Sequence, residues 1–237
     1  SDEQNAAVIA ALELVAKLSK IPENARELEK SGLFELVSDA ALAAAEAGND
    51  ALLAAAINLF TSACTDPDVC ASMVAKGLVS NLVSMFNKHP GCKKGKLAPS
   101  SMLELLSKVA GHGHKDNLRD AKADDFIMSL MGINPDSAEL MALGANILGE
   151  LLTPQDLLHR AIVKVKELIK QVKGGQTSAK VFGAVKSELS GLMSLIYVDG
   201  AVTKATGKEL LDLAVEILNV MHPHDSADAE NIKATAM

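Results

Sequence analysis

One pattern recurs along this chain at intervals of about 45 residues, and it constrains the fold more than any single residue does. Each copy runs from a leucine-rich stretch, through a polar break with Pro, Asp or Asn, to a second apolar pair. The copies occupy residues 11–37, 57–83 and 103–131, and a fourth begins at 146–154 before it fades. Repeats of this length are typical of helical units that stack on their neighbours and build extended surfaces. The pattern predicts a chain that holds a partner along a groove.

Helical spacing of apolar residues runs through the chain, and no segment is predicted as a strand. Gly32 and Gly77 follow short predicted helices, where a left-handed C-terminal cap is expected. A capping side chain stands before a proline at three expected helix starts: Asp66-Pro67, Asn134-Pro135 and Thr153-Pro154. We expect helices at residues 5–19, 23–30, 33–47, 50–64, 67–75, 78–87, 98–110, 116–122, 124–132, 136–152, 155–173, 178–197 and 206–221.

The repeats divide the chain into three parts. Residues 1–155 hold about three and a half repeat units, and residues 156–222 are expected to continue or cap the stack. Residues 89–99, rich in Gly and Lys, are expected to form a loop between two helices. Residues 223–237 are polar and are expected to form a disordered tail.

The composition suits closely packed helices and argues against nucleic-acid binding. The 237 residues include no Trp, one Tyr and five Phe, so Ala, Leu, Val and Met must fill the interior. The formal net charge is −7, and residues 1–157 hold 13 basic and 21 acidic side chains. A general nucleic-acid binder is expected to be basic, whereas these repeats are acidic.

Cysteine usage indicates a reducing, intracellular environment. Cys64, Cys70 and Cys92 are odd in number and lack metal-ligand spacing, which favours a cytoplasmic protein without disulfides. No secretory apolar region and no apolar run of about 18 residues is present, so no transmembrane span is predicted. The chain starts at Ser1 without a methionine, which leaves room for a targeting segment that was removed.

The repeats resemble armadillo repeats over roughly residues 5–155. The matching features are the polar start of the short first helix, the Gly-Leu step before the second helix, and a leucine-rich third helix. The third-helix residues are Leu12, Leu14 and Leu18, then Ile57 and Leu59, then Leu103 and Leu105. The related HEAT repeats lack the short first helix and are the nearest alternative. The resemblance implies an all-α fold: a right-handed α-solenoid of three-helix repeats whose third helices line a concave groove.

Aligning the copies on their leucines predicts a row of polar groove residues. Leu14, Leu59, Leu105 and Ile147 become equivalent buried positions, as do Leu18, Ala63, Val109 and Leu151 one turn later. The residues before them are Glu13, Asn58, Glu104 and Asn146, followed by Lys17, Ser62, Lys108 and Glu150. One interpretation is that all eight form a solvated face and nothing more. The other is that they contact an extended protein or peptide partner. The Asn amides are suited to this role because they both donate hydrogen bonds to a peptide backbone and accept them from it.

The charges of this row bear on the kind of partner. Armadillo proteins that carry nuclear import cargo resemble one another in a Trp and Asn ladder, but this chain has no Trp. The expected Asn position holds Lys17, Ser62, Lys108 and Glu150, which argues against import-signal binding. A groove of mixed sign predicts a partner of mixed charge. Glu13–Lys17 and Glu104–Lys108 are alternatively pairs within one helix, worth about 0.2–0.5 kcal/mol each.

Catalytic and metal sites are not supported by the sequence. His89, Cys92, His112 and His114 are potential ligands, but a predicted helix of about 20 Å separates the two pairs. Cys64 and Cys70 are expected to be buried thiols that pack as small apolar groups. The turn at 174–177 lacks the spacing of a phosphate-binding loop. We therefore expect no metal, no cofactor and no enzymatic activity.

A basic amphipathic helix follows Thr153-Pro154. Its apolar stripe is Leu158, Ile162, Val165, Ile169 and Val172, and its basic side is Arg160, Lys164, Lys166, Lys170 and Lys173. The stripe is expected to pack against the fourth repeat. The basic side alternatively binds an acidic partner or an anionic membrane surface.

Three functional hypotheses follow from these patterns. The first is a non-enzymatic adaptor or scaffold that binds a protein segment in the groove. The second is self-association, with the basic 158–186 region of one chain meeting the acidic repeats of another. The third is a metal- or ligand-binding helical domain around Asp199, because residues 192–217 are faintly similar to tellurite-resistance B-type domains. An ordinary Asp-Gly turn is the alternative there, since Thr206 and Lys208 stand where an acidic partner is expected.

Overall fold

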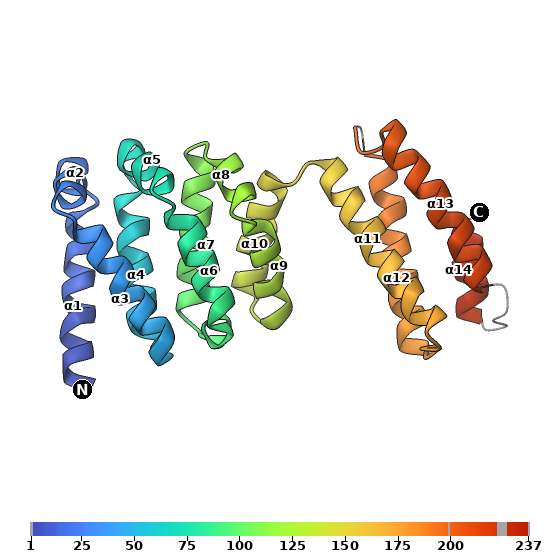
Figure 1. Ribbon diagram of the computed structural model, residues 1–237, viewed down its shortest axis with the longest axis horizontal. Helices are drawn as coiled ribbons and strands as arrows, with labels where there is room; N and C mark the ends of the chain where they lie inside the picture. Colours follow the sequence, from blue (N-terminus) through green and yellow to red (C-terminus); the bar gives the residue numbers. More distant parts are fainter. Residues whose placement is uncertain (1, 199, 222–226, 237) are drawn as a thin grey trace. The chain divides into compact units, whose positions relative to one another are not determined.

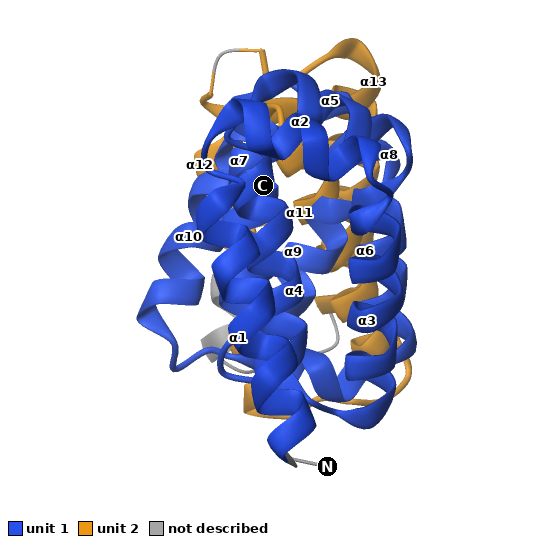
Figure 2. Cartoon of the chain, turned by 90° about the vertical axis from the view of Figure 1, so that its left-hand side faces the viewer, with its two compact units in different colours: residues 1–151 blue, residues 152–237 orange. Residues whose placement is uncertain are grey.

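The chain is all-α and divides into two compact units. The computed structural model describes residues 2–198, 200–221 and 227–236, and these ranges contain helices and no strand. Unit 1 comprises Ser1–Leu151 and unit 2 comprises Leu152–Met237 (Figure 2). Every helix expected between residues 5 and 221 is present, with ends within three residues of the predicted ones.

Unit 1 repeats one order of helices, a short helix followed by two longer ones. It opens with α1 (Asp2–Leu18). The first set is α2 (Pro22–Lys30), α3 (Leu33–Ala47) and α4 (Asp50–Ala63). The second is α5 (Pro67–Ala75), α6 (Leu78–Lys88) and α7 (Ala98–Gly111), with the 3₁₀ helix η1 (Pro90–Lys94) inside the predicted loop. The third is α8 (Lys115–Asp120), α9 (Ala123–Ile133) and α10 (Ala138–Leu151).

The helices of unit 1 form layers that repeat along it. Helices α1, α4, α7 and α10 pack in sequence, each mainly against its neighbours in that row. Helices α3, α6 and α9 lie on the opposite side, and α2, α5 and α8 lie at one end (Figures 1 and 2). One continuous core runs from Leu12 to Leu151. The row of α1, α4, α7 and α10 therefore presents one shared surface.

The aligned leucine positions are buried in three of the four copies. Leu59, Leu105 and Ile147 are at most 1% exposed. Leu14 and Leu18 are 59% and 46% exposed, so the expectation that they are buried was wrong. The reason is that α1 packs against α4 on one side and has solvent on the other, whereas α4 and α7 each have a neighbour on both sides.

The turn between the first two helices of each set has the predicted left-handed backbone. Gly32 and Gly77 have φ values of +77° and +84°, which glycine adopts without steric cost. Lys122 occupies the same place in the third set with φ +54°, the only positive φ at a non-glycine residue in the described ranges. A side chain with a Cβ is strained in this conformation. The third copy thus keeps the turn without its glycine.

Replacing Lys122 with Gly is expected to stabilise unit 1 by about 0.5–1 kcal/mol, because the relief of left-handed strain exceeds the added flexibility of the unfolded chain. Urea unfolding would measure the change. Lys122→Ala removes the same charge but keeps the Cβ and is the matched control. If the Gly and Ala variants were equally stable, the left-handed backbone at residue 122 would not be strained by a Cβ.

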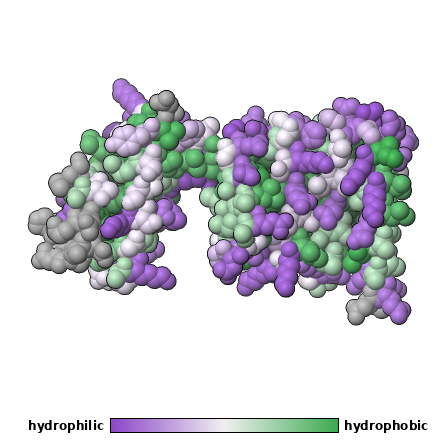
Figure 3. Space-filling view, turned by 180° about the vertical axis from the view of Figure 1, so that it is seen from behind, coloured by the Kyte–Doolittle hydropathy of each residue, from purple (hydrophilic) through white to green (hydrophobic). Residues whose placement is uncertain are grey.

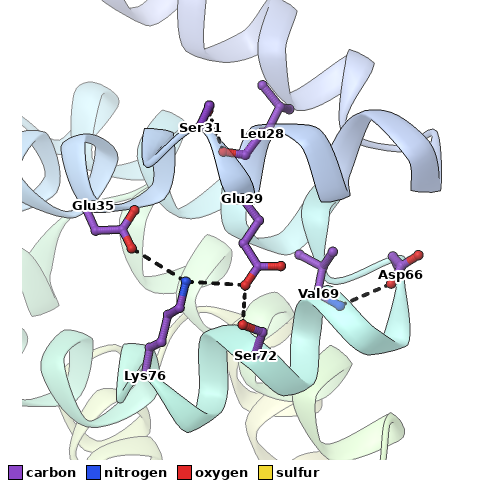
Figure 4. A network of polar contacts seen from close by, with 8 residues as sticks. All are labelled: Leu28, Glu29, Ser31, Glu35, Asp66, Val69, Ser72 and Lys76. Atoms are coloured by element: carbon purple, nitrogen blue, oxygen red, sulfur yellow. Dashed lines mark hydrogen bonds and ion pairs between the residues drawn. The ribbon is translucent and has the colours of Figure 1, made fainter.

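Polar contacts join the short helices of successive sets. Glu29 of α2 accepts a hydrogen bond from the Ser72 hydroxyl of α5 (Figure 4). It also forms an ion pair with Lys76, at the C-terminal end of α5. Lys76 Nζ lies 3.3 Å from Glu29 Oε1 and 3.6 Å from Glu35 Oε1. These contacts fix the register of α5 on α2.

Asp66 makes the second contact between these helices. Its side chain is 1% exposed, accepts N–H bonds from Asp68 and Val69 at the start of α5, and lies 2.7 Å from Arg26 Nη2 of α2. Burial alone would raise the pKa of Asp66, but the Val69 N–H, Arg26 and the Asp68 N–H outweigh it. Together they hold this pKa below its ordinary value of 3.8.

Asp66→Ala is expected to cost about 2–4 kcal/mol of unfolding free energy at neutral pH, because it removes a helix cap and a charge-assisted bond. Since the folded pKa is depressed, this stability is present above pH 3.8 and is lost as the pH falls through the folded value. Denaturant unfolding across that range should show the difference from wild type shrinking in acid. Asp68→Ala, at a side chain 88% exposed, is the control and should change stability little. A difference independent of pH would contradict the linkage.

Unit 2 has its own core. It contains α11 (Pro154–Lys173), α12 (Ala179–Ile196), α13 (Lys204–Met221) and α14 (Ala227–Ala236). Thr153 caps α11 reciprocally with Asp156, as the Thr-Pro step predicted. The stripe Leu158–Val172 was expected to pack on the fourth repeat, but it is buried against α12 and α13 within unit 2.

The C-terminal segment also differs from expectation. Residues 227–236 form α14 rather than a disordered tail, and Ile232 is buried in the core of unit 2. One apolar residue in a polar segment is a weak sequence signal for a helix. Here Ile232 packs on the apolar surface that α12 and α13 provide, and this contact is what holds α14. Among the described residues, no single helix is long and apolar enough to cross a membrane, although α5 and α6 reach that length as a pair bent by 57°.

Candidate partner-binding groove

A concavity of about 440 Å³ lies on the face of unit 1 that the row of long helices builds. Figure 3 shows this face, where hydrophilic side chains alternate with apolar and neutral ones. Helices α1, α4, α7 and α10 all contribute to it, together with the loop before α7. We call it the groove. Its lining residues are Ile9, Glu13, Ala51, Ala54, Ala55, Asn58, Lys96, Leu97, Ser100, Ser101, Glu104 and Glu139.

Three of the eight predicted contact residues line the groove together. Glu13 of α1, Asn58 of α4 and Glu104 of α7 are exposed and come from three successive long helices. Asn146 is exposed on α10 but is not part of the lining. The second predicted row, Lys17, Ser62, Lys108 and Glu150, also lies outside the lining.

Two members of that second row have partners at the C-terminal ends of the helices. Lys108 Nζ donates to Thr65 Oγ1 at 2.8 Å rather than pairing with Glu104. Glu150 lies 3.4 Å from Lys115 of α8. The Lys108 contact joins α7 of the second set to the end of the first set, whereas the Glu150 contact lies within the third set. Both contacts lie outside the groove lining.

The groove extends toward the helix N-termini instead. Ser100, Ser101 and Glu139 were not predicted, although they lie three to seven residues before Glu104 and Asn146 and so share a helix face with them. Counting backward along the same face would have found them. Lys96 and Leu97 belong to a loop, and no helical spacing signals their position.

Asp50 holds this loop at the edge of the groove. Its Oδ2 accepts N–H bonds from Lys96 and Leu97, both at 2.9 Å, and its Oδ1 accepts from Ala98 at 3.0 Å. A residue at the start of α4 thereby caps the start of α7. Gly95 makes the approach possible, because a Cβ there would lie 2.0 Å from Asp50 Oδ1. The loop therefore depends on one carboxylate and one glycine.

Gly95→Ala is expected to destabilise unit 1 by about 2–3 kcal/mol, because the added methyl displaces the Asp50 carboxylate from three backbone donors. Thermal or urea unfolding would measure the loss. Gly91→Ala is the matched control, since a Cβ at Gly91 meets nothing within 4 Å. If the two variants were equally stable, the close approach of Asp50 to Gly95 would not contribute to the stability of unit 1.

Two groups in the groove have hydrogen-bonding capacity that the protein does not use. Ser101 is only 7% exposed, and within the described residues its hydroxyl has no hydrogen-bond partner. Asn58 is exposed and its amide is likewise without a side-chain bond in the part of the chain that the structure describes. The Ser101 oxygen is not among the buried unpaired atoms of the described residues, so it opens on the groove. A ligand in the groove would complete the bonding of Ser101.

The basic side of α11 is partly neutralised by its own unit. Lys164 lies 2.6 Å from Glu188 and Lys173 lies 2.6 Å from Glu216. Arg160 is half-buried, and all four lysines are exposed. Of these, Lys166 and Lys170 make no ion pair within the described residues. Asp199, around which a ligand site was considered, lies outside the described residues.

The cysteines are packed as core residues. Cys64, Cys70 and Cys92 are free and buried. A hydrogen bond with Cys70, together with burial, raises the pKa of the Cys64 thiol, and burial beside Asp50 raises that of Cys92. His112 Nε2 lies 2.6 Å from the Cys64 carbonyl oxygen. In the described ranges no group of three or more His, Cys, Asp or Glu side chains is placed to hold a metal ion.

Neither a protein-family model, nor a curated protein, nor a solved structure matches this chain. The functional inference therefore depends on the lining of the groove, its charge and its unpaired polar groups. These features belong to unit 1 alone.

Proposed function

We propose that unit 1 is an armadillo-like, right-handed α-solenoid that serves as a non-enzymatic protein-interaction scaffold. It binds an extended segment of a partner protein across its long helices, in the groove. The observation that carries the proposal is that Glu13, Asn58 and Glu104, from three successive helices, line one concavity. Surfaces built in this way from stacked helical units are the usual binding surfaces of repeat proteins.

The chemistry of the lining supports an extended segment. Ala51, Ala54 and Ala55 are small, so the backbone of a ligand can approach α4 closely. Asn58, Ser100 and Ser101 supply donors and acceptors for peptide groups, and Ile9 and Leu97 supply apolar contact. Because Asp50 already fixes the loop wall, little ordering entropy is lost on binding.

A steric block tests this function. Ala51 is exposed on α4 and lines the groove, so Ala51→Trp fills the groove from the surface without entering the core. Peptides selected from a display library on the wild-type chain are expected to bind this variant about tenfold or more weakly, since the indole occupies their site. Fluorescence anisotropy of the labelled peptides would measure the dissociation constants.

The control is Ala43→Trp, at an exposed residue of α3 outside the groove lining. It adds the same aromatic surface to the opposite layer and is expected to leave peptide binding unchanged. Selected peptides that bind Ala51→Trp as well as wild type would show that the groove is not the binding surface.

A further inference from the structure

The charge of the groove differs from that of the predicted row. Its lining carries three carboxylates, Glu13, Glu104 and Glu139, against one ammonium, Lys96. The two basic residues of the predicted row, Lys17 and Lys108, lie outside it, and Lys96 was not predicted. The predicted row contains charges of both signs, but the groove itself is acidic. An acidic concavity favours a basic ligand.

The helix N-termini around the groove do not cancel this charge. The starts of α4, α7 and α10 carry partial positive charge from their first N–H groups. Asn49 accepts from Leu52 at the start of α4, and Asp50 accepts from three N–H groups at the start of α7. At α10 the Ser137 hydroxyl oxygen accepts from the Leu140 N–H. Part of this positive charge is therefore already compensated, and the Asp50 carboxylate adds a further negative charge beside the lining.

Ser101 is a second and independent indication of a ligand. The residue is 7% exposed and lines the groove, and its hydroxyl oxygen, which bonds to no other described residue, is open to the groove rather than enclosed. It stands three residues before Glu104 on α7, between the carboxylates of α1 and α10. A peptide carbonyl or N–H lying there would pair with the hydroxyl while basic side chains reach the carboxylates.

The spacing of the carboxylates sets the spacing of the basic residues. Packed helices lie roughly 8–10 Å apart, so Glu13 and Glu104 are separated by two helix intervals. Glu139 is one interval from Glu104 and also lies seven residues, about 10 Å, nearer the helix N-terminus than Asn146, so it is about 14 Å from Glu104. An extended chain advances roughly 3.3 Å per residue. The matching segment carries basic side chains roughly five and then roughly four residues apart.

Building on the proposed function, we infer that the partner segment is a basic, extended peptide that places Lys or Arg opposite Glu13, Glu104 and Glu139. Asn58, between the first two carboxylates, bonds to its backbone. The acidic lining disfavours acidic segments by like-charge repulsion. Specificity then comes from the sign and the spacing of the charges rather than from a deep pocket.

The test uses synthetic Gly/Ser peptides of about twelve residues with three lysines at the inferred intervals. The comparison peptides carry three glutamates at the same places, three adjacent lysines, or no charge. Anisotropy titrations of the full chain at low salt and at about 0.15 M salt give the affinities. The spaced lysine peptide is expected to bind about tenfold more tightly than the glutamate peptide, with a preference that falls as salt rises.

Glu13→Gln with Glu104→Gln removes two lining charges at exposed positions and keeps the side-chain volume. This double variant is expected to bind the spaced lysine peptide about fivefold more weakly with an unchanged melting temperature. Glu46→Gln with Glu167→Gln removes the same charge at exposed positions outside the lining and should leave binding unchanged.

The outcomes separate this inference from the proposed function. Equal binding of the lysine and glutamate peptides, or equal weakening by the two double variants, overturns the basic partner. If the display-selected peptides still lose affinity for Ala51→Trp in that case, the groove remains the binding surface. If Ala51→Trp leaves every peptide bound, the proposed function itself is overturned.

Discussion

The long helices of unit 1 bury their apolar residues against their neighbours in the row, and α4 and α10 also pack on α3 and α9 of the opposite layer. Leu59 and Leu105 are buried because α4 and α7 have a long neighbour on both sides, and Ile147 is buried because α10 packs on both α7 and α9. Leu14 is exposed because α1 packs mainly on α4. The same packing places α1, α4, α7 and α10 next to one another and leaves their polar residues on a common surface. The groove is therefore a by-product of how the core is buried.

The local features of this fold could be predicted from the sequence because their causes are local. Asp66 and Thr153 cap helices, and Gly32 and Gly77 adopt left-handed turns, for reasons contained within a few residues. The repeat period also placed Glu13, Asn58 and Glu104 on one face, since equal positions in equal units face the same way.

Other features depend on contacts that no local pattern encodes. Which turn of each helix lines the groove is set by the loop that Asp50 draws in across 46 or more residues of sequence. The apolar stripe of α11 would look the same in the sequence whether it packed on the fourth repeat or on α12 and α13. The sequence therefore could not show which of these surfaces it covers. The helix at α14 likewise depends on the surface that buries Ile232. Sequence patterns predicted the elements, and long-range contacts determined their partners.

The groove lining comes from four successive long helices, and packing and polar contacts between neighbouring sets hold them in place. A small rotation of one set against the next would change the distance between Glu13 and Glu104 while hardly disturbing any helix. The width of the groove is thus an elastic property of the stack. A bound chain that bridges several sets would stiffen them, so occupancy in one place would slow the opening of backbone hydrogen bonds in helices that it never touches.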